Sequence, residues 1–507
     1  MSDTILARLE ARAPAARAIG APGRPWLDTR ALLALAAETR ARLAAVGIGR
    51  GDRLAIVLPN GPEMAAAFVS VAAATCAATL NPAYRDEEFS FYLSDLKPKA
   101  LLIQTGLGSP ARAVAARLGI PLIELSPEPE GPAGLFRLDT SALSPAAPAQ
   151  DGPVTPADAA LVLHTSGTTA RPKIVPLSNA NLAASARHIG STLALGPADA
   201  CLNIMPLFHI HGLIGATLSS LAAGAGVSCT SGFNAIRFLS QAEDVRPTWY
   251  SAVPTMHQAI LARAEREKER ARALNLRFIR SSSSSLPRQV MAALEEVFGC
   301  PVIESYGMTE ASHQMTSNPL PPRPRKPGSV GPAAGPEVAI MDGSGGLLPP
   351  GESGEVVIRG PNVTKGYAEN PEANAKSFTD GWFRTGDEGR LDQEGYLWLT
   401  GRIKEIINRA GEKISPLEVD AILMDHPAVA QVVTFALPHT LLGEEVAAAV
   451  VLRERFSTTE GELREFCSTR LSAYKVPRKI LFMKEIPKGA TGKLQRIGLA
   501  QKLGLAG

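Results

Sequence analysis

Short aliphatic runs alternate with alanine-rich stretches through the N-terminal part of this 507-residue chain. The runs at residues 54–58, 101–103 and 121–123 have the length of β-strands, and the stretches between them are typical of helices. Strands that alternate with helices usually form parallel sheets covered by helical layers. We therefore predict an α/β fold, with parallel sheets in its N-terminal part.

The pattern changes twice in the last third of the chain. Residues 351–360, 381–389 and 395–401 are glycine-bounded turns between short alternating segments, which is typical of antiparallel β structure. A mixed segment of about a hundred residues follows, which is the size of a small domain. We predict a large N-terminal domain at residues 1–402, with layered α/β subdomains and a β-rich subdomain. A small C-terminal α+β domain should occupy residues 403–507, with a boundary near Lys404.

Composition and charge exclude several classes of protein. Hydrophobic residues make up 45% of the chain and the net charge is only +3, without a block of basic residues, so no nucleic-acid partner is predicted. The most apolar run, residues 65–80, is too short to span a membrane, and we interpret it as a buried helix. No secretory signal is expected from residues 1–25, which lack a continuous apolar core. A cytoplasmic location without disulfides or zinc is expected from five scattered cysteines: Cys76, Cys201, Cys229, Cys300 and Cys467.

A loop rich in hydroxyl side chains follows the apolar run at residues 159–163. Its sequence, TSGTTARPK at residues 165–173, offers N–H and O–H donors and a lysine charge that suit phosphate oxygens. The pattern is not that of a Walker A loop, and on its own it would more often be a flexible surface segment. The candidate phosphate ligands are Thr165, Ser166, Gly167, Thr168, Thr169 and Lys173.

Further motifs follow this loop, and each alone would more often be a turn or a solvated surface segment. They are ESYGMTE at 304–310, WFRTGD at 382–387, GRIK at 401–404, NRAGEKISP at 408–416 and PKGATGK at 487–493. Together and in this order they resemble the adenylate-forming superfamily, which includes acyl-CoA synthetases, plant coumarate ligases, firefly luciferase and peptide-synthetase adenylation domains. The resemblance extends over residues 159–496. The chain departs from it at Ala170 and Ile174, where the superfamily usually has glycine.

The resemblance implies that the chain binds ATP, Mg²⁺ and coenzyme A. It also implies that Tyr306 stacks on adenine, that Asp387 binds the ribose hydroxyls and that Lys493 reaches the α-phosphate. Glu310 and Thr168 would hold Mg²⁺, which prefers oxygen ligands. Further implied nucleotide-binding residues are Ser283, Glu304, Ser305, Gly307, Met308, Thr309 and Arg402. The implied catalytic residues are Lys493, Glu310, His209 and Thr165.

The C-terminal domain of this superfamily rotates between the two half-reactions. By the resemblance, Lys404 lies at the hinge, and Gly411 and Lys413 approach the channel for the CoA thiol. We therefore expect the small domain to be mobile.

The acyl pocket is implied by residues 208–212, residues 280–286 and the segment after Glu310. His209 corresponds to a residue near the acyl carbon that gates the thiol channel. The sequence MTEASHQMTSNP at residues 308–319, together with His211, resembles the oxalyl-CoA synthetase branch most closely. The implied substrate-binding residues are His211, Ser283, Ser284 and His313, whose polar groups suit a second carboxylate.

The predicted function is that of an ATP-dependent acid–CoA ligase, which forms an acyl-adenylate, releases pyrophosphate and passes the acyl group to CoA. Oxalate or another small carboxylic acid is the predicted substrate. Malonate and medium-chain, long-chain or aryl acids stay open, because one methylene changes discrimination by only about 1–3 kcal/mol. Two other classes also stay open: an adenylation domain that loads a carrier protein or oxidises its adenylate, and a nucleotide binder without catalysis.

Overall fold

The computed structural model describes residues 3–165, 172–489 and 494–505. Its first layer is a sheet in the order β7-β6-β5-β3-β4-β8-β9, in which the inner strands run parallel and β7 and β9 are antiparallel edges. The predicted strands at residues 54–58, 101–103 and 121–123 correspond to β3, β5 and β6. The bounds are β3 Arg53–Val57, β4 Cys76–Thr79, β5 Ala100–Gln104, β6 Leu122–Pro127, β7 Phe136–Asp139, β8 Ala159–His164 and β9 Ile174–Ser178.

A second α/β sheet has the order β15-β14-β13-β12-β10-β11-β1-β2, and only its two outermost strands are antiparallel. Buried apolar side chains form one continuous core between the two sheets, and this core extends into the β-rich part of the chain. The bounds are β1 Arg17–Ala21, β2 Arg24–Asp28, β10 Ala200–Asn203, β11 Gly226–Cys229, β12 Trp249–Ala252, β13 Phe278–Ser281, β14 Val302–Met308 and β15 His313–Ser317.

The helices that cover these sheets begin at recognisable local signals. Ser178 and Asn181 form a reciprocal capping box at the start of α6, and prolines open α3, α5 and α9. The helices are α1 Ile5–Glu10, α2 Thr29–Ala45, α3 Pro62–Ala72, α4 Asp86–Leu96, α5 Pro110–Arg117, α6 Asn179–Thr192, α7 Ser219–Ala222, α8 Phe238–Val245, α9 Pro254–Ala264, α10 Lys268–Ala273, α11 Arg288–Phe298 and α12 Pro371–Ser377. A π-helix, η1, spans His211–Leu218, and 3-10 helices span Glu265–Glu267 (η2) and Thr309–Ala311 (η3).

The apolar run at residues 65–80 is a buried helix only in its first half. Helix α3 ends at Ala72, and the chain then enters β4, whose residues are all buried between β3 and β8. The prediction of one helix was wrong in the second half, because a central parallel strand is as uniformly apolar as a buried helix. Within the described ranges, no helix is long and apolar enough to cross a membrane.

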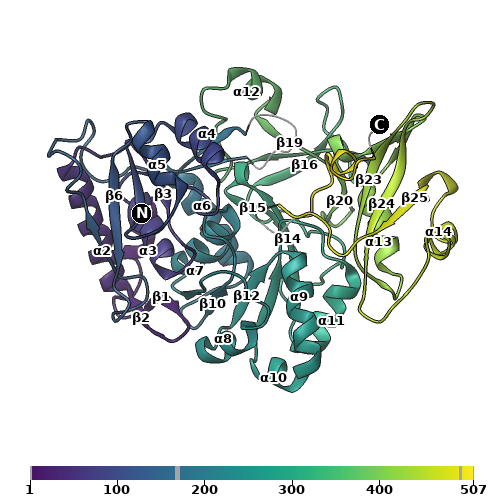
Figure 1. Ribbon diagram of the computed structural model, residues 1–507, viewed down its shortest axis with the longest axis horizontal. Helices are drawn as coiled ribbons and strands as arrows, with labels where there is room; N and C mark the ends of the chain where they lie inside the picture. The colour runs from purple at the N-terminus through teal and green to yellow at the C-terminus, as the bar shows by residue number, and fades with distance from the viewer. Residues whose placement is uncertain (1–2, 166–171, 490–493, 506–507) are drawn as a thin grey trace.

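The remainder of the chain forms an antiparallel β subdomain and a small C-terminal domain (Figure 1). The β subdomain comprises β16 Glu337–Met341, β17 Ser353–Arg359, β18 Phe378–Thr379, β19 Trp382–Leu391 and β20 Leu397–Arg402. The small domain comprises β21 Ile407–Arg409, β22 Glu412–Ile414, α13 Pro416–Met424, β23 Val429–His439, β24 Gly443–Leu452, α14 Glu460–Ser468, η5 Ala473–Lys475, β25 Lys479–Phe482 and α15 Leu499–Lys502. This arrangement confirms the predicted fold class.

The C-terminal domain has its own apolar core, which begins at Ile407. The 3-10 helix η4, Ile403–Glu405, connects it to β20, so Lys404 lies on the short link between the two sheets. The domain lies beside α11 and β20 (Figure 1), where Gln289 donates a hydrogen bond of 2.8 Å to Asp425. Few such bonds join the two domains within the described ranges, which suits an interface that changes.

Candidate active site

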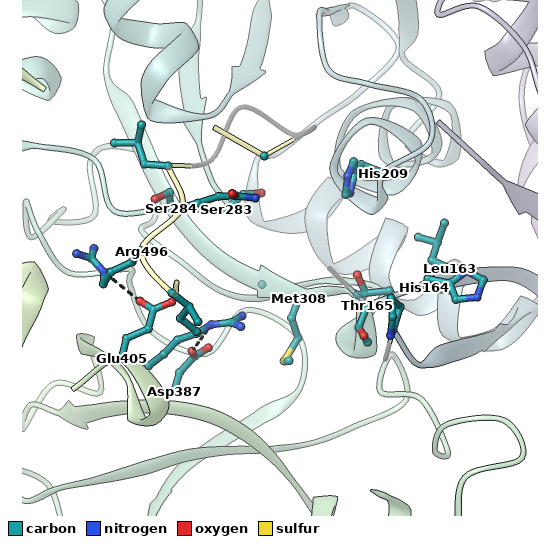
Figure 2. A pocket seen from close by; sticks show the side chains of 18 of the residues that line it. Leu163, His164, Thr165, His209, Ser283, Ser284, Met308, Asp387, Glu405 and Arg496 are labelled. Carbon is teal, nitrogen blue, oxygen red and sulfur yellow. Dashed lines mark hydrogen bonds and ion pairs between the residues drawn. The ribbon is translucent and has the colours of Figure 1, made fainter. Parts of the chain in front are cut away.

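A cavity of about 750 Å³ lies where strands β8 and β14 end and the C-terminal domain covers them. Ligands of open α/β sheets bind at the carboxyl ends of the strands, and this cavity has that position. His164 and Thr165 lie on one side of it, Asp387, Glu405 and Arg496 on the other, and Met308 between them (Figure 2). The predicted residues that line the cavity are Thr165, His209, Ser283, Ser284, Ser305, Tyr306, Gly307, Met308, Thr309, Asp387 and Arg402.

Other predicted residues lie away from the cavity wall or outside the description. Ser166, Gly167, Thr168, Thr169 and Lys493 fall outside the described residues. Those that are described but do not line the cavity are Lys173, His211, Glu304, Glu310, His313, Lys404, Gly411 and Lys413.

Tyr306, Asp387 and Arg402 form a connected group on the cavity wall. The hydroxyl group of Tyr306 donates a hydrogen bond to Asp387, and Arg402 Nε lies 3.3 Å from Asp387 Oδ1. Asp387 and Arg402 are cross-strand partners on β19 and β20, which explains why two separate motifs meet. Burial and the adjacent carboxylate raise the pKa of Tyr306, so its phenol keeps the proton that it donates. Asp387 has further acceptor positions, as binding of ribose hydroxyls requires.

Glu310 and Lys173 are joined behind the cavity by a residue that the sequence did not indicate. Tyr367 donates a hydrogen bond of 2.9 Å to Glu310 Oε1, and Lys173 Nζ lies 4.4 Å from the centre of the Tyr367 ring. Burial raises the pKa of Glu310, because it disfavours the charged carboxylate. A cation bound beside Glu310 would stabilise the charged form.

No cluster of three or more metal-ligating side chains exists within the described part of the chain. A single buried carboxylate at Glu310 nevertheless fits Mg²⁺, because this ion usually keeps several waters and binds phosphate oxygens alongside one or two protein carboxylates.

The two ends of the phosphate loop are tied together. The backbone N–H of Thr165 donates to the carbonyl of Lys173 (2.9 Å), and the N–H of Lys173 donates to Thr165 Oγ1 (3.1 Å). His164 directly precedes Thr165. Its Nε2 lies 3.0 Å from Asp95 Oδ2, and its ring packs against Tyr92. His164 lines the cavity and was missed, because the sequence does not show that it meets Asp95.

The predicted acyl-binding histidines occupy different positions. His209 lines the cavity and packs beside Phe208. His211 is buried behind the wall, with Nδ1 3.1 Å from Ser283 Oγ and Nε2 2.6 Å from Ser251 Oγ. The His313 ring packs edge-to-face on His211 at 4.9 Å. Only Ser283 and Ser284 of the predicted substrate residues therefore form the wall itself.

Glu304 was predicted to bind nucleotide, but its carboxylate turns away from the cavity. It accepts a hydrogen bond of 3.1 Å from the backbone N–H of Gly328. Burial raises the pKa of Glu304 from its ordinary value of 4.5 to about 7. The motif places this side chain on the opposite side of β14 from Ser305, because neighbouring strand residues point in opposite directions.

The C-terminal domain contributes part of the wall. Gly489 and Leu494, which flank residues 490–493, line the cavity. Arg496, which follows Leu494, forms ion pairs with Glu405 Oε2 (3.1 Å) and Asp420 Oδ2 (2.9 Å). Gly411 and Lys413 lie on the exposed β21–β22 hairpin, away from the cavity.

Comparison with known proteins agrees with these features. The family described as "AMP-binding enzyme" matches residues 7–368, and the one described as "AMP-binding enzyme C-terminal domain" matches residues 418–493. The chain belongs to the AMP-binding enzyme family. It is 46% identical to the oxalate–CoA ligase of Arabidopsis thaliana, over 99% of this chain and 98% of the relative. It is 42% identical to that of Saccharomyces cerevisiae, over 89% of this chain and 87% of the relative.

A solved structure of this AMP-binding fold also matches over the whole chain. ATP-bound MatB from Rhodopseudomonas palustris has a TM-score of 0.88, with 29% identity over 99% of both chains. The same protein without ATP has a TM-score of 0.79. The described structure is therefore closer to the ATP-bound form of that protein.

These findings confirm the predicted enzyme class. The chain is an ATP-dependent, AMP-forming acid–CoA ligase, which uses ATP, Mg²⁺ and CoA.

Proposed function

We propose that this AMP-binding enzyme converts oxalate to oxalyl-CoA. One observation carries the proposal: the wall at Ser283 is backed by a buried polar layer, in which His211 is hydrogen-bonded between Ser283 and Ser251. A long-chain or aryl acid needs an apolar pocket at this point, because buried polar groups without partners are unfavourable. A second carboxylate would instead accept hydrogen bonds from the wall hydroxyls of Ser283 and Ser284, the first of which His211 orients. The relatives named for oxalate support the same substrate.

The first half-reaction replaces a poor leaving group. A carboxylate oxygen of the acid attacks the α-phosphate of ATP, the bond to pyrophosphate breaks, and an acyl-adenylate forms. Asp387 and Tyr306 would hold the nucleoside, and Arg402 would supply positive charge toward the phosphates from the cavity wall. Lys173 and Lys493 would add further positive charge there. Mg²⁺ held beside Glu310 and Thr168 would neutralise charge on the phosphate oxygens. Ser166, Gly167 and Thr169 would donate hydrogen bonds to the same phosphate oxygens.

The second half-reaction transfers the acyl group to CoA. The thiol of CoA loses its proton, its sulfur attacks the acyl carbon and AMP leaves. His209 lines the cavity near the proposed acyl position, which supports a role at the thiol channel. Gly411 and Lys413 lie away from the cavity in the present arrangement, so their proposed approach requires rotation about Lys404.

We also propose a cytoplasmic location and no nucleic-acid partner. All five cysteines are buried and unpaired, which suits a reducing compartment. The net charge of +3 on 507 residues offers little attraction for a polyanion.

Pyrophosphate release across a panel of acids tests the substrate, with and without CoA. We expect kcat/KM for oxalate to exceed that for malonate, butyrate, benzoate and palmitate, and AMP release at steady state to depend on free CoA. A preference for butyrate or longer acids would contradict the oxalate assignment. Turnover with a carrier protein but not with CoA would contradict the proposal that CoA is the acyl acceptor.

A further inference from the structure

Arg280 is a buried cation that the reaction described above does not use. It lies on β13, with a side chain that has no solvent exposure. Its Nη2 donates a hydrogen bond of 3.0 Å to Gln314 Oε1. Its Nε and Nη1 have no hydrogen-bond partner within residues 3–165, 172–489 and 494–505. Donors that are buried without acceptors are unfavourable, and such groups are rare in folded proteins.

The guanidinium group lies in the same buried layer as the two histidines. Arg280 is the cross-strand partner of Ser251, so both side chains leave the sheet on one face. Ser251 Oγ is the atom 2.6 Å from His211 Nε2. A methyl group placed on Gly215 would lie 2.5 Å from His313 Nε2 and 3.2 Å from Arg280 Nη1, so both groups converge on this glycine of η1.

No residue that the structure describes compensates the charge of Arg280. Burial lowers the pKa of Arg280 to about 10, which still leaves it cationic at neutral pH, and no described carboxylate forms an ion pair with it. Gln314 cannot turn freely to satisfy more of its donors, because its amide nitrogen is bound to the carbonyl of Ala334 (2.9 Å) and to Thr192 (3.2 Å). A buried charge without a counter-ion is unfavourable, and an anion that enters from outside would compensate it.

We propose that Arg280 is the positioning residue that supplies the positive charge for the second carboxylate of a small dicarboxylate. It lies in the buried layer of His211 and His313, behind the cavity wall that Ser283 forms (Figure 2). The Ser283 hydroxyl at the wall donates to the far carboxylate, and the positive charge of Arg280 behind it balances the charge of that carboxylate. This inference rests on the proposed oxalate activity and assigns its selectivity to one residue.

The test compares Arg280→Met, which removes the charge, with Arg280→Lys, which keeps it. The substrates are oxalate, its monoamide oxamate, which has similar shape but a neutral far end, and propionate. For Arg280→Met, kcat/KM for oxalate should fall on the order of 10²-fold, mainly through KM, as when one member of a buried charge pair is truncated. The values for oxamate and propionate should change only about threefold, and Arg280→Lys should recover part of the oxalate activity.

Arg277→Met is the matched control. Arg277 precedes the same strand but pairs with Asp199 at 3.0 Å on its exposed side, so its loss should leave the ratio of oxalate to oxamate unchanged. Thermal unfolding gives a second readout, because oxalate should raise the Tm of wild type and not of Arg280→Met. If Arg280→Met does not fold, the Arg280→Lys variant decides alone. Because lysine places its charge differently, kcat/KM for oxalate should fall in this variant, while kcat/KM for oxamate should stay near the wild-type value.

Equal losses for all three acids, or an unchanged oxalate preference, would overturn the role of Arg280 while leaving the proposed function intact. A wild-type enzyme that does not turn over oxalate would overturn the proposed function itself, together with this inference.

Discussion

The hydroxyl group of Tyr306 donates a hydrogen bond to Asp387, so the ring proposed to stack on adenine and the carboxylate proposed to bind ribose fix each other's position. The two residues lie on different sheets, β14 and β19. One contact therefore couples the α/β part of the site to the β subdomain.

Tyr306→Phe should weaken ATP binding and leave the chemistry largely intact. The ring remains, but a hydrogen bond to a charged group is lost, which is worth about 1.5–3 kcal/mol. We expect KM for ATP and Kd for AMP to rise on the order of tenfold, with kcat changed much less. Tyr306→Leu, which also removes the ring, should weaken both further. Equal affinities for wild type and Tyr306→Phe would show that the contact does not organise the nucleotide site.

Tyr367→Phe should move the acidic limb of the pH–activity profile to higher pH. Burial raises the pKa of Glu310 and the Tyr367 hydroxyl lowers it, so removal of the hydroxyl raises the pKa further. Because Glu310 must be ionised to hold Mg²⁺, activity is lost as pH falls through this pKa, and the loss should begin at higher pH in the variant. The profile of kcat/KM for ATP is the measurement. Added Mg²⁺ should move the limb back, and a profile that does not move would contradict the role of Glu310.

Glu304→Gln should stabilise the enzyme at alkaline pH. The folded-state pKa of Glu304 is raised from 4.5 to about 7. Its contribution to the free energy of unfolding is therefore fully present below pH 4.5 and is lost as pH rises through 7. The amide cannot ionise, yet its oxygen still accepts from Gly328. The variant should gain about 1–3 kcal/mol near pH 8 and much less near pH 5. Tm at the two pH values measures this, with the exposed Glu10→Gln as a control. A difference independent of pH would contradict it.

Motifs predicted much of the site because they lie where strands end or pair. Residues 304–310 end β14, and Asp387 and Arg402 are cross-strand partners, so local sequence brings them to one place. The layered fold could also be predicted, because the alternation of strands and helices is a local pattern of the sequence.

The sequence could not predict contacts between single residues that are far apart. Tyr367 meets Glu310, and Asp95 meets His164, only through tertiary packing, and neither contact has a local pattern. The direction of a side chain is also set by packing, which is why His211 was expected on the cavity wall and lies behind it.

Lys493→Ala should separate the two half-reactions. Only adenylation develops charge at the α-phosphate, so loss of one preorganised donor should slow acid-dependent pyrophosphate release on the order of 10²–10³-fold. Thioester formation from supplied oxalyl-AMP should be spared. Lys488→Ala is the control, because Lys488 lies in the same motif and pairs with Glu485 at 3.1 Å on the exposed side of the domain. Equal losses in both half-reactions would contradict the assignment of Lys493.

Lys404→Pro should have the opposite effect. Lys404 lies in η4, the short link between β20 of the large domain and β21 of the small one, and its side chain is exposed. Residues 494–498 line the cavity, whereas Gly411 and Lys413 do not, which suits the arrangement proposed for adenylation and not that proposed for the thiol step. Proline fixes φ near −65° and so restricts the backbone change that a hinge needs.

We expect adenylation by Lys404→Pro, measured as exchange of labelled pyrophosphate into ATP, to stay within about threefold of wild type. Thioester formation from supplied oxalyl-AMP and CoA should fall on the order of tenfold or more, because the rotation precedes it. Lys404→Ala removes the same side chain but keeps backbone freedom, and it should behave like wild type in both assays. If the alanine variant loses as much thioester formation as the proline variant, the ammonium group of Lys404 matters and the backbone hinge does not. Unchanged CoA turnover in Lys404→Pro would place the pivot at another residue.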